Sequence, residues 1–204
     1  MSRLDRWSLT VLAAIDQLGG GIRAGRSGVA GGVLPSQVGG VATIGRQGLT
    51  TPRILFVCTG NICRSPTAEA VLVHRARDQG VDLVADSAGI SAEELGNPPD
   101  ARARKIAARR GYRLPDRGAR LVEASDYTSF DRLIGMTARH LHALERSAPG
   151  GSTARIELFM SYAPAHGLTE VPDPWYGGTQ DFEHALDLIE AGVDGLLRDL
   201  AGQR

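Results

Sequence analysis

Residues 53–66 read RILFVCTGNICRSP, and this stretch decides the fold. Its first part, residues 53–57, is rich in aliphatic and aromatic side chains, a composition typical of a strand buried on both faces of a parallel sheet. A helix is expected to begin at Ser65-Pro66, because proline at the first helical position loses no hydrogen bond that the helix needs. A strand, a short loop and a helix in this order indicate an α/β fold.

The loop between the strand and the helix has the composition of an anion-binding site with its own nucleophile. Free backbone N–H groups at a helix N-terminus, with about half a positive charge from the helix dipole, favour a bound phosphate or a thiolate. Cys58 is therefore the candidate nucleophile, and Arg64, six residues later, can bind two phosphate oxygens at once. Ser65 can donate a hydrogen bond to the sulfur. Gly60 and Asn61 are the residue types that best tolerate a left-handed backbone in such a loop.

The spacing of the cysteine and the arginine is a weak signal by itself. Arginine is abundant in this chain, with 22 copies in 204 residues, so the pair can arise by chance. A free cysteine is also commonly a small buried apolar residue. The context favours a functional site, because a strand precedes the loop, glycine and asparagine lie within it, and serine, proline and a helix follow.

A second stretch, residues 171–178 with the sequence VPDPWYGG, is expected to form a loop. Cleavage of a phosphate ester needs a proton for the departing oxygen, and Asp173 is the candidate acid; such proton donation contributes about 10² to 10⁴ in rate. Trp175 and Tyr176 would form an aromatic wall beside the pocket. Taken alone, Asp-Pro is a common turn opener, and the aromatic residues could simply cover the core.

Four motifs together resemble the low-molecular-weight protein tyrosine phosphatases. They occur in the order seen in that family: residues 58–66 (CTGNICRSP), 86–89 (DSAG), 96–100 (GNPPD) and 173–177 (DPWYG). The resemblance extends from about Thr51 to Leu200. It implies one compact α/β domain, with a four-stranded parallel sheet flanked by helices on both faces, no metal or other cofactor, and a two-step phosphoenzyme mechanism.

The resemblance also implies a role for each residue of the two motif loops. Cys58 would attack phosphorus, Arg64 would hold the equatorial oxygens, and Asp173 would first donate a proton and then activate water. The residues expected to bind the substrate are Thr59, Gly60, Asn61, Ile62, Cys63, Ser65, Trp175 and Tyr176. The expected activity is hydrolysis of protein phosphotyrosine and of small aryl phosphates.

The chain departs from the family pattern at three positions near the expected site. Many members carry an aromatic residue in the segment 91–95, where this chain offers Glu93. Thr137 stands where the family often has an aspartate, and Arg110 stands where some animal members have a histidine linked to the loop serine. None of these changes touches the expected nucleophile, phosphate clamp or acid.

Three alternatives stay open on the same fold. Related protein arginine phosphatases place threonine at the position of Ile62, whose apolar surface favours a phenyl ring. Arsenate reductases that depend on thioredoxin use further downstream cysteines, and this sequence has none after Cys63. A catalytically idle phosphate-binding adaptor would result if the altered pocket wall misplaced Asp173. Cys63 itself is either a small buried residue or, as the resemblance implies, a thiol that forms a disulfide with Cys58 under oxidation.

Composition narrows the remaining function classes. Two cysteines close together exclude a disulfide scaffold, and a nucleophilic thiol suits a reducing cytoplasm. The 23 basic and 23 acidic side chains balance, so we expect no binding to nucleic acid, and no apolar stretch is long enough to indicate a membrane partner. We expect a cytoplasmic monomer that acts on a phosphotyrosine-containing protein, including a cognate tyrosine kinase if the host is bacterial.

The chain is expected to divide at about residue 50. Residues 1–50 hold 11 of the 26 glycines and one short apolar run, so we expect a disordered N-terminal extension with one short helix near residues 7–18. Residues 51–204 should form the phosphatase-like domain. The expected strands are 53–57, 83–87, 131–136 and 155–159, and the expected helices are 66–79, 100–110, 138–147 and 181–200.

Other polar side chains are interpreted as structural. The histidines lack metal-ligand spacing, and most are expected to face solvent: His74, His140, His142, His166 and His184. Asp100 is expected to cap the helix that it precedes. The basic residues of that helix are interpreted as a solvated face that could also attract acidic phosphopeptides: Arg102, Arg104, Lys105, Arg109 and Arg110.

Overall fold

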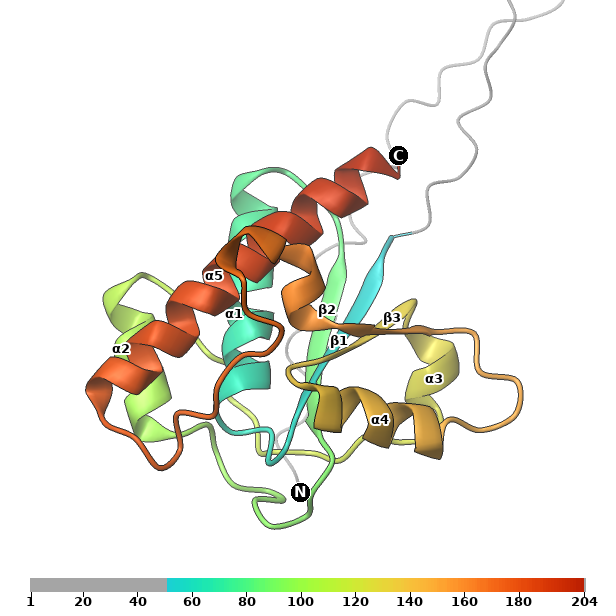
Figure 1. The fold of residues 1–204 in the computed structure, drawn as a ribbon, viewed down its shortest axis with the longest axis horizontal. Helices are drawn as coiled ribbons and strands as arrows, with labels where there is room; N and C mark the ends of the chain where they lie inside the picture. Colours follow the sequence, from blue (N-terminus) through green and yellow to red (C-terminus); the bar gives the residue numbers. More distant parts are fainter. Residues whose placement is uncertain (1–50, 204) are drawn as a thin grey trace, which may run out of the picture. The chain divides into compact units, whose positions relative to one another are not determined.

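The computed structural model describes residues 51–203, and the expected N-terminal extension, residues 1–50 with its short helix, lies outside the described residues. Strands and helices alternate along most of the described chain (Figure 1). The elements are β1 (Arg53–Cys58), α1 (Arg64–Asp78), β2 (Val84–Gly89), α2 (Ala101–Arg109), α3 (Asp126–Ser129), β3 (Arg132–Gly135), α4 (Ala138–Ser147), β4 (Arg155–Leu158), the 3₁₀ helices η1 (Phe159–Tyr162) and η2 (Pro164–His166), and α5 (Thr179–Gly202).

The four strands form one parallel sheet in the order β2-β1-β3-β4, which confirms the expected fold class. Strand β1 lies between two neighbours, and Val57 is paired with Ala88 of β2 on one side and with Gly135 of β3 on the other. Residues 54–57 of this strand have no exposed surface. This central position explains why the strand is uniformly apolar, since a strand that is covered on both faces has no polar side.

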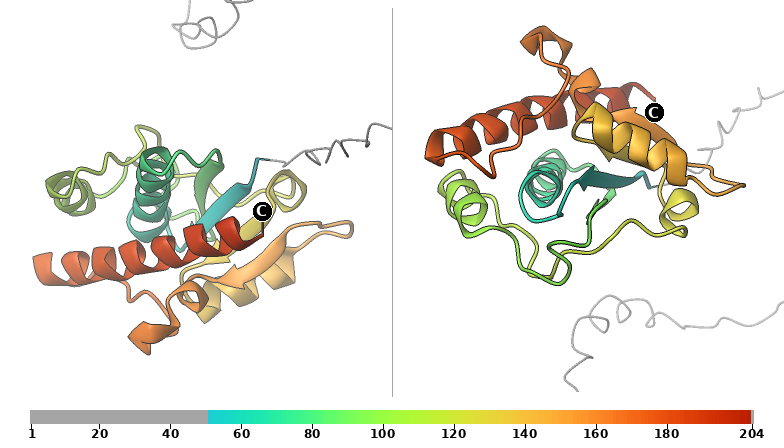
Figure 2. Two further views of the ribbon diagram at one scale, coloured as in Figure 1. Left: turned by 90° about the horizontal axis from the view of Figure 1, so that it is seen from above. Right: turned by 60° about the horizontal axis from the view of Figure 1, so that its bottom comes forward.

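The two faces of the sheet belong to two separate apolar cores. Ile54 and Phe56 of β1 contribute to the larger core, which includes residues of α1, α2 and α5. Leu55 and Val57 point to the opposite face and pack in the smaller core beside α3 and α4. The helices therefore flank the sheet on both faces, as Figure 2 shows from two further directions. Strand β1 contributes to both cores because successive side chains along a strand point to opposite faces of the sheet.

The observed element boundaries agree with the expected ones to within about two residues for most elements. The sequence suggested that Pro66 is at the first helical position. Helix α1 instead begins at Arg64, so Pro66 is its third residue. Proline is still tolerated there, because the first four N–H groups of a helix have no partner within the helix. Helix α3 and the two 3₁₀ helices were not expected, since three or four residues are too few to produce a periodic pattern.

Helix α5 carries the longest apolar stripe of the described chain. Its expected core residues are all buried: Phe182, Ala185, Leu186, Ile189, Val193, Leu196, Leu197 and Leu200. Within residues 51–203, no helix combines the length and the apolar character that crossing a bilayer requires.

Two glycines of α5 provide a test of how closely this helix packs. A methyl group added at Gly195 would lie 1.8 Å from the carbonyl oxygen of Tyr162, whereas one added at Gly202 would meet no atom within 4 Å. Gly195→Ala should therefore lower the free energy of unfolding by about 1 to 3 kcal/mol, as overpacking does. Gly202→Ala is the matched control and should be neutral or slightly stabilising. Urea denaturation of both variants measures the difference, and equal midpoints would contradict the close packing.

Candidate active site

The loop that joins β1 to α1 depends on two residues for its shape. Asn61 has a φ of 57°, the left-handed conformation expected for it. Gly60 does not have a positive φ, so the expectation of a left-handed backbone there was wrong. What requires glycine at this position is space, because a Cβ atom on Gly60 would lie 2.9 Å from Cγ of Glu94. The neighbouring segment therefore packs directly on the loop backbone.

Asn61 holds the loop through its side-chain amide, which is buried. Its Nδ2 donates to Oγ of Ser65 at 3.0 Å and to Oγ of Ser87 at 2.9 Å. Its Oδ1 accepts a hydrogen bond from the backbone N–H of Arg120 at 3.0 Å. The amide thus joins the start of α1, the strand β2 and the segment after α2. Because these contacts occupy the side chain, Asn61 lies behind the pocket and shapes it from there.

Cys58 is the last residue of β1, and only 2% of its surface is exposed. Its Sγ lies 3.0 Å from Oγ of Ser65. Ser65 already accepts a hydrogen bond from Asn61, so its own proton is free to go to the sulfur or to the carbonyl oxygen of Ala88 at 3.3 Å. The Ser65 hydroxyl is thus placed to donate a hydrogen bond to the sulfur. The arrangement expected for Ser65 is therefore present.

Arg64 points toward the second loop and is 4% exposed. One terminal nitrogen donates to the carbonyl oxygen of Val171 at 3.2 Å, and the other forms an ion pair with the carboxylate of Asp173. Nε of Arg64 is buried and has no hydrogen-bond partner among the residues that the structure describes. A buried guanidinium N–H without a partner costs free energy, which makes it suited to receive an anionic ligand.

The two motif loops meet at a pocket of about 110 Å³. Its lining residues are Cys58, Thr59, Gly60, Ile62, Cys63, Arg64, Glu93, Glu94, Asp173, Trp175 and Tyr176. The pocket brings together every site residue singled out from the sequence except Asn61 and Ser65, which support the loop from behind. Tyr176 is 95% exposed and Trp175 is 37% exposed, so both aromatic side chains lie toward solvent. Glu94 was not expected here, although the segment that contains it was.

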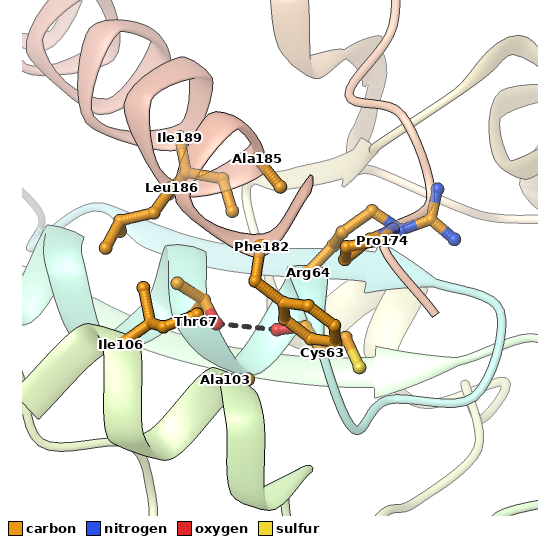
Figure 3. A pocket seen from close by; sticks show the side chains of 10 residues that line it. All are labelled: Cys63, Arg64, Thr67, Ala103, Ile106, Pro174, Phe182, Ala185, Leu186 and Ile189. Atoms are coloured by element: carbon orange, nitrogen blue, oxygen red, sulfur yellow. Dashed lines mark hydrogen bonds between the residues drawn. The ribbon is translucent and has the colours of Figure 1, made fainter. Parts of the chain in front are cut away.

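A second, much smaller cavity of about 10 Å³ lies between Cys63, Arg64 and the apolar side chains of α2 and α5 (Figure 3). Such a volume holds one water molecule at most. Figure 3 also shows the hydroxyl of Thr67 donating to the carbonyl oxygen of Cys63, at 2.7 Å. Burial, reinforced by the negative charge of Asp100, raises the pKa of the Cys63 thiol far above its usual range. Cys63 is therefore a neutral thiol at physiological pH.

His140 of α4 contacts the nucleophile loop, which the sequence did not indicate. The expectation that most histidines face solvent is wrong for His140, which is 1% exposed. Its Nε2 lies 3.0 Å from Oγ1 of Thr59, and its Nδ1 lies 2.8 Å from Oγ1 of Thr137. Burial, together with the positive charges of Arg64 and Arg139, lowers the pKa of His140 to about 3. Thr137, one of the departures from the family pattern, is thus the second partner of a neutral imidazole.

The signal that could have found this contact needs the strand order, which places β3 beside β1. Parallel strands end at the same edge of a sheet, so the residues that follow β3 were bound to lie near the residues that follow β1. His140 comes five residues after the end of β3, and Thr59 comes directly after β1.

Helix α2 begins beside the pocket. The carboxylate of Asp100 accepts hydrogen bonds from the backbone N–H groups of Arg102 and Ala103, which confirms the expected cap. Arg102 is exposed, as expected for a solvated face, but that interpretation is incomplete, because its side chain also reaches the second loop. It is also incomplete for Arg110, which pairs with Asp187 and Glu190 of α5.

No group of three or more His, Cys, Asp or Glu side chains within residues 51–203 is arranged to hold a metal ion. The nucleophile loop and the Arg64 guanidinium line the pocket, and the guanidinium, whose Nε–H has no partner among the described residues, suits an anion better than a cation. A cysteine, an arginine and an aspartate around such a pocket, on a parallel α/β sheet, are typical of cysteine-dependent phosphatases.

The comparisons identify the family within that class. Residues 53–204 match the family model described as low molecular weight phosphotyrosine protein phosphatase, and the chain belongs to this family. A low molecular weight protein-tyrosine-phosphatase of Streptomyces coelicolor is 44% identical over 152 residues, which cover 72% of this chain and 92% of that protein. The chain is accordingly a phosphoric monoester hydrolase of the protein-tyrosine-phosphatase class.

Solved structures agree with this assignment. A protein tyrosine phosphatase from Entamoeba histolytica, with Hepes in the active site, superposes with a TM-score of 0.71 at 33% identity, covering 75% of this chain and 99% of that one. An arginine phosphatase from Drosophila superposes with a TM-score of 0.68 at 30% identity, covering 72% and 96%. The fold alone therefore does not separate the two substrate classes.

The buried imidazole of His140 predicts a dependence of stability on pH. An unfolded chain protonates this histidine below about pH 6.5, whereas the folded protein resists protonation until about pH 3. The unfolded state therefore binds more protons in this window, and stability falls as the pH falls. Between pH 7.5 and 5.5, the wild type should lose about 1 kcal/mol more than His140→Asn does. Urea unfolding at both pH values measures this.

His142→Asn is the matched control, because His142 is an exposed histidine of the same helix. It should keep the pH dependence of the wild type. If His140→Asn shows the same pH dependence as the wild type, His140 is not held neutral by the fold.

Proposed function

We propose that this protein hydrolyses protein phosphotyrosine and small aryl phosphates through a cysteinyl-phosphate intermediate, with Cys58 as nucleophile, Arg64 as phosphate clamp and Asp173 as general acid and base. One observation carries the proposal. The sulfur, the guanidinium and the carboxylate line the same small pocket, although Asp173 is 115 residues away from Cys58 in the chain.

The first chemical step forms a bond between sulfur and phosphorus. The Cys58 thiolate attacks phosphorus, the ester P–O bond breaks, and the departing oxygen takes a proton from Asp173. The remaining phosphate oxygens accept hydrogen bonds from the loop N–H groups and from the planar fork of Arg64. These donors stabilise the charge that builds up on the oxygens in the transition state.

The second step returns the enzyme to its starting state. Asp173, now a carboxylate, takes a proton from a water molecule, which attacks phosphorus and breaks the bond to sulfur. Inorganic phosphate leaves and the thiolate is regenerated. Ser65 supports both steps, because a hydrogen bond from its hydroxyl stabilises the sulfur anion as nucleophile and as leaving group.

Substrate binding has to exchange one ion pair for another. Arg64 is paired with the Asp173 carboxylate in this structure, and a phosphate that takes over the guanidinium frees that carboxylate, which takes up a proton from solvent before it donates to the leaving-group oxygen. The unpartnered Nε of Arg64 gives the guanidinium a second donor for the same phosphate. The ion pair thus fixes the positions of Arg64 and Asp173 until a substrate phosphate replaces the carboxylate.

The pocket wall supports an aromatic substrate. Ile62 offers the ring an apolar contact, and Trp175 and Tyr176 stand at the solvent side of the pocket. Glu93 stands in a segment where many relatives have an aromatic residue, so ring stacking depends on the two aromatic side chains of the second loop. A phenyl ring fits these contacts better than a planar cation, which would need a polar partner at Ile62.

We propose a cytoplasmic location and a phosphotyrosine-containing protein as the partner, with a cognate tyrosine kinase as the first candidate. A reducing compartment suits a nucleophilic thiol, because disulfides rarely persist there. Action as a monomer, and a protective disulfide between Cys58 and Cys63, remain predictions. Substrate trapping with Asp173→Ala followed by mass spectrometry would identify the partner.

Hydrolysis of para-nitrophenyl phosphate tests the assigned roles. Cys58→Ser should reduce turnover to background, because the hydroxyl is a far weaker nucleophile than the thiolate. Asp173→Ala should lower kcat by about 10² to 10⁴. Acid-quenched reactions with labelled substrate should show phosphate on the protein in the wild type and none in Cys58→Ser. Wild-type turnover no higher than that of Cys58→Ser would favour an idle phosphate-binding adaptor instead.

Ile62→Thr tests the substrate class. The wild type should hydrolyse a phosphotyrosine peptide with a kcat/KM at least about tenfold higher than that for a matched phosphoarginine peptide, since a buried polar mismatch is costly. Ile62→Thr should narrow this ratio by giving the guanidinium a hydroxyl partner. A wild-type preference for phosphoarginine would overturn the assignment of the substrate class, and reduction of arsenate with thioredoxin would indicate the third activity of this fold.

A further inference from the structure

The N-terminus of α2 contacts both loops of the candidate active site. The backbone N–H of Asp100 donates to the carbonyl oxygen of Ile62 in the nucleophile loop, at 2.8 Å. The carboxylate of the same residue caps α2 and pairs with the guanidinium of Arg102 at 3.1 Å. Asp100 is therefore anchored to the nucleophile loop, and it holds the side chain of Arg102 in place.

Arg102 extends this connection to the second loop. Its Nη1 donates to the carbonyl oxygen of Trp175 at 3.2 Å and to that of Gly177 at 3.4 Å. The guanidinium carbon also lies 5.4 Å from the centre of the Trp175 ring and 4.5 Å from that of Phe182. These distances are typical of cation–π contacts. The guanidinium therefore touches both the backbone and the aromatic wall of the loop that follows Asp173.

Apart from the packing of the buried Pro174 beside α2 and α5, few side-chain contacts hold this loop. Within the described chain, only Arg64 and Arg102 reach residues 173–177 from other elements through side-chain hydrogen bonds. The remaining hydrogen bonds are local, such as those from Trp175 N–H to Asp173 and from Gly177 N–H to Pro174. When a phosphate takes the guanidinium of Arg64, Arg102 is the side-chain anchor that remains.

We propose that Arg102 is a positioning residue, which holds residues 173–177 so that the carboxyl group of Asp173 faces the leaving-group oxygen after the substrate has displaced it from Arg64. This inference rests on the proposed function, because it needs Asp173 to be the general acid. Arg102 does not touch the reacting atoms. It acts through the loop, and it couples the acid to the nucleophile loop through Asp100.

A structural role alone makes a different prediction. The side chain of Arg102 is 43% exposed, and an ion pair at the surface contributes little to stability. If Arg102 only stabilised the fold, its loss would slow all substrates equally. If it positions the acid, its loss should matter most for substrates whose leaving group needs a proton, because proton donation accelerates these most.

The test compares phenyl phosphate, whose phenoxide is a poor leaving group, with para-nitrophenyl phosphate, whose leaving group departs readily. Arg102→Ala should lower kcat/KM at least about tenfold for phenyl phosphate, which is part of the contribution of a general acid, and less than about threefold for para-nitrophenyl phosphate. Arg104→Ala is the matched control, since Arg104 is exposed on the same helix and its side chain forms no hydrogen bond or ion pair with the described residues. It should behave as the wild type.

A double-mutant cycle with Asp173→Asn then shows whether Arg102 acts through the acid. In the Asp173→Asn background, Arg102→Ala should cause no further loss on phenyl phosphate, because there is no acid left to position. Additive losses, equal losses for the two substrates, or no loss in Arg102→Ala would each overturn the inference. If Asp173→Asn loses more activity on phenyl phosphate than on para-nitrophenyl phosphate but Arg102→Ala does not, the inference fails and the proposed function stands.

If Asp173→Asn itself responds equally to both leaving groups, then Asp173 is not the acid, and the proposed role and the inference both fail. Two further variants keep the test decisive if Arg102→Ala folds poorly. Asp100→Asn keeps an acceptor for the helix cap but removes the ion pair with Arg102, and Arg102→Lys keeps the charge without the planar fork. Both should show the same selective loss on phenyl phosphate, to a smaller extent, with thermal midpoints close to that of the wild type.

Discussion

The rest of the site depends on the hydrogen bonds of one buried amide, that of Asn61. This side chain connects the start of α1, the strand β2 and the segment after α2, while its own backbone adopts a left-handed conformation. The loop is therefore fixed by contacts within its own chain, without a ligand. Ser65 is held by the same amide, and its hydroxyl in turn meets the sulfur of Cys58.

The second constraint is electrostatic and joins the two motif loops. Arg64 is buried among neighbours that satisfy only part of its hydrogen-bonding capacity, and Asp173 supplies the missing charge. A buried guanidinium without an anion would be unstable, so the loop that carries Asp173 is held against Arg64. In the proposed mechanism, a phosphate has to compete with this carboxylate for Arg64, so substrate binding and release of the acid are coupled. Arg102 gives the loop a second attachment that does not compete with the substrate.

The strands, the four longer helices and most of the pocket residues could be predicted because their signals are local. The apolar run of β1 and the stripe of α5 have clear periodicities, and the two motif loops are marked by glycine, proline and asparagine. Helix α3 was missed because four residues carry no period. The reason for glycine at position 60 was also missed, because the side chain that excludes a Cβ atom there, Glu94, comes 34 residues later. The contacts of His140 and Arg102 were also missed. A polar side chain is expected to face solvent, and its residue type does not show which other segments lie against it.

By itself, the sequence determined the α/β order, the buried character of the first strand and the chemical identity of the candidate nucleophile, clamp and acid. These features can be read from residue types and from spacings within short segments of the sequence. Tertiary structure alone decided that His140 lies behind Thr59 as a neutral imidazole, that Asp173 pairs with Arg64, and that Arg102 spans from α2 to the second loop. These contacts join residues 73 to 109 positions apart. They follow from which strand ends share an edge of the sheet, and no local pattern records that.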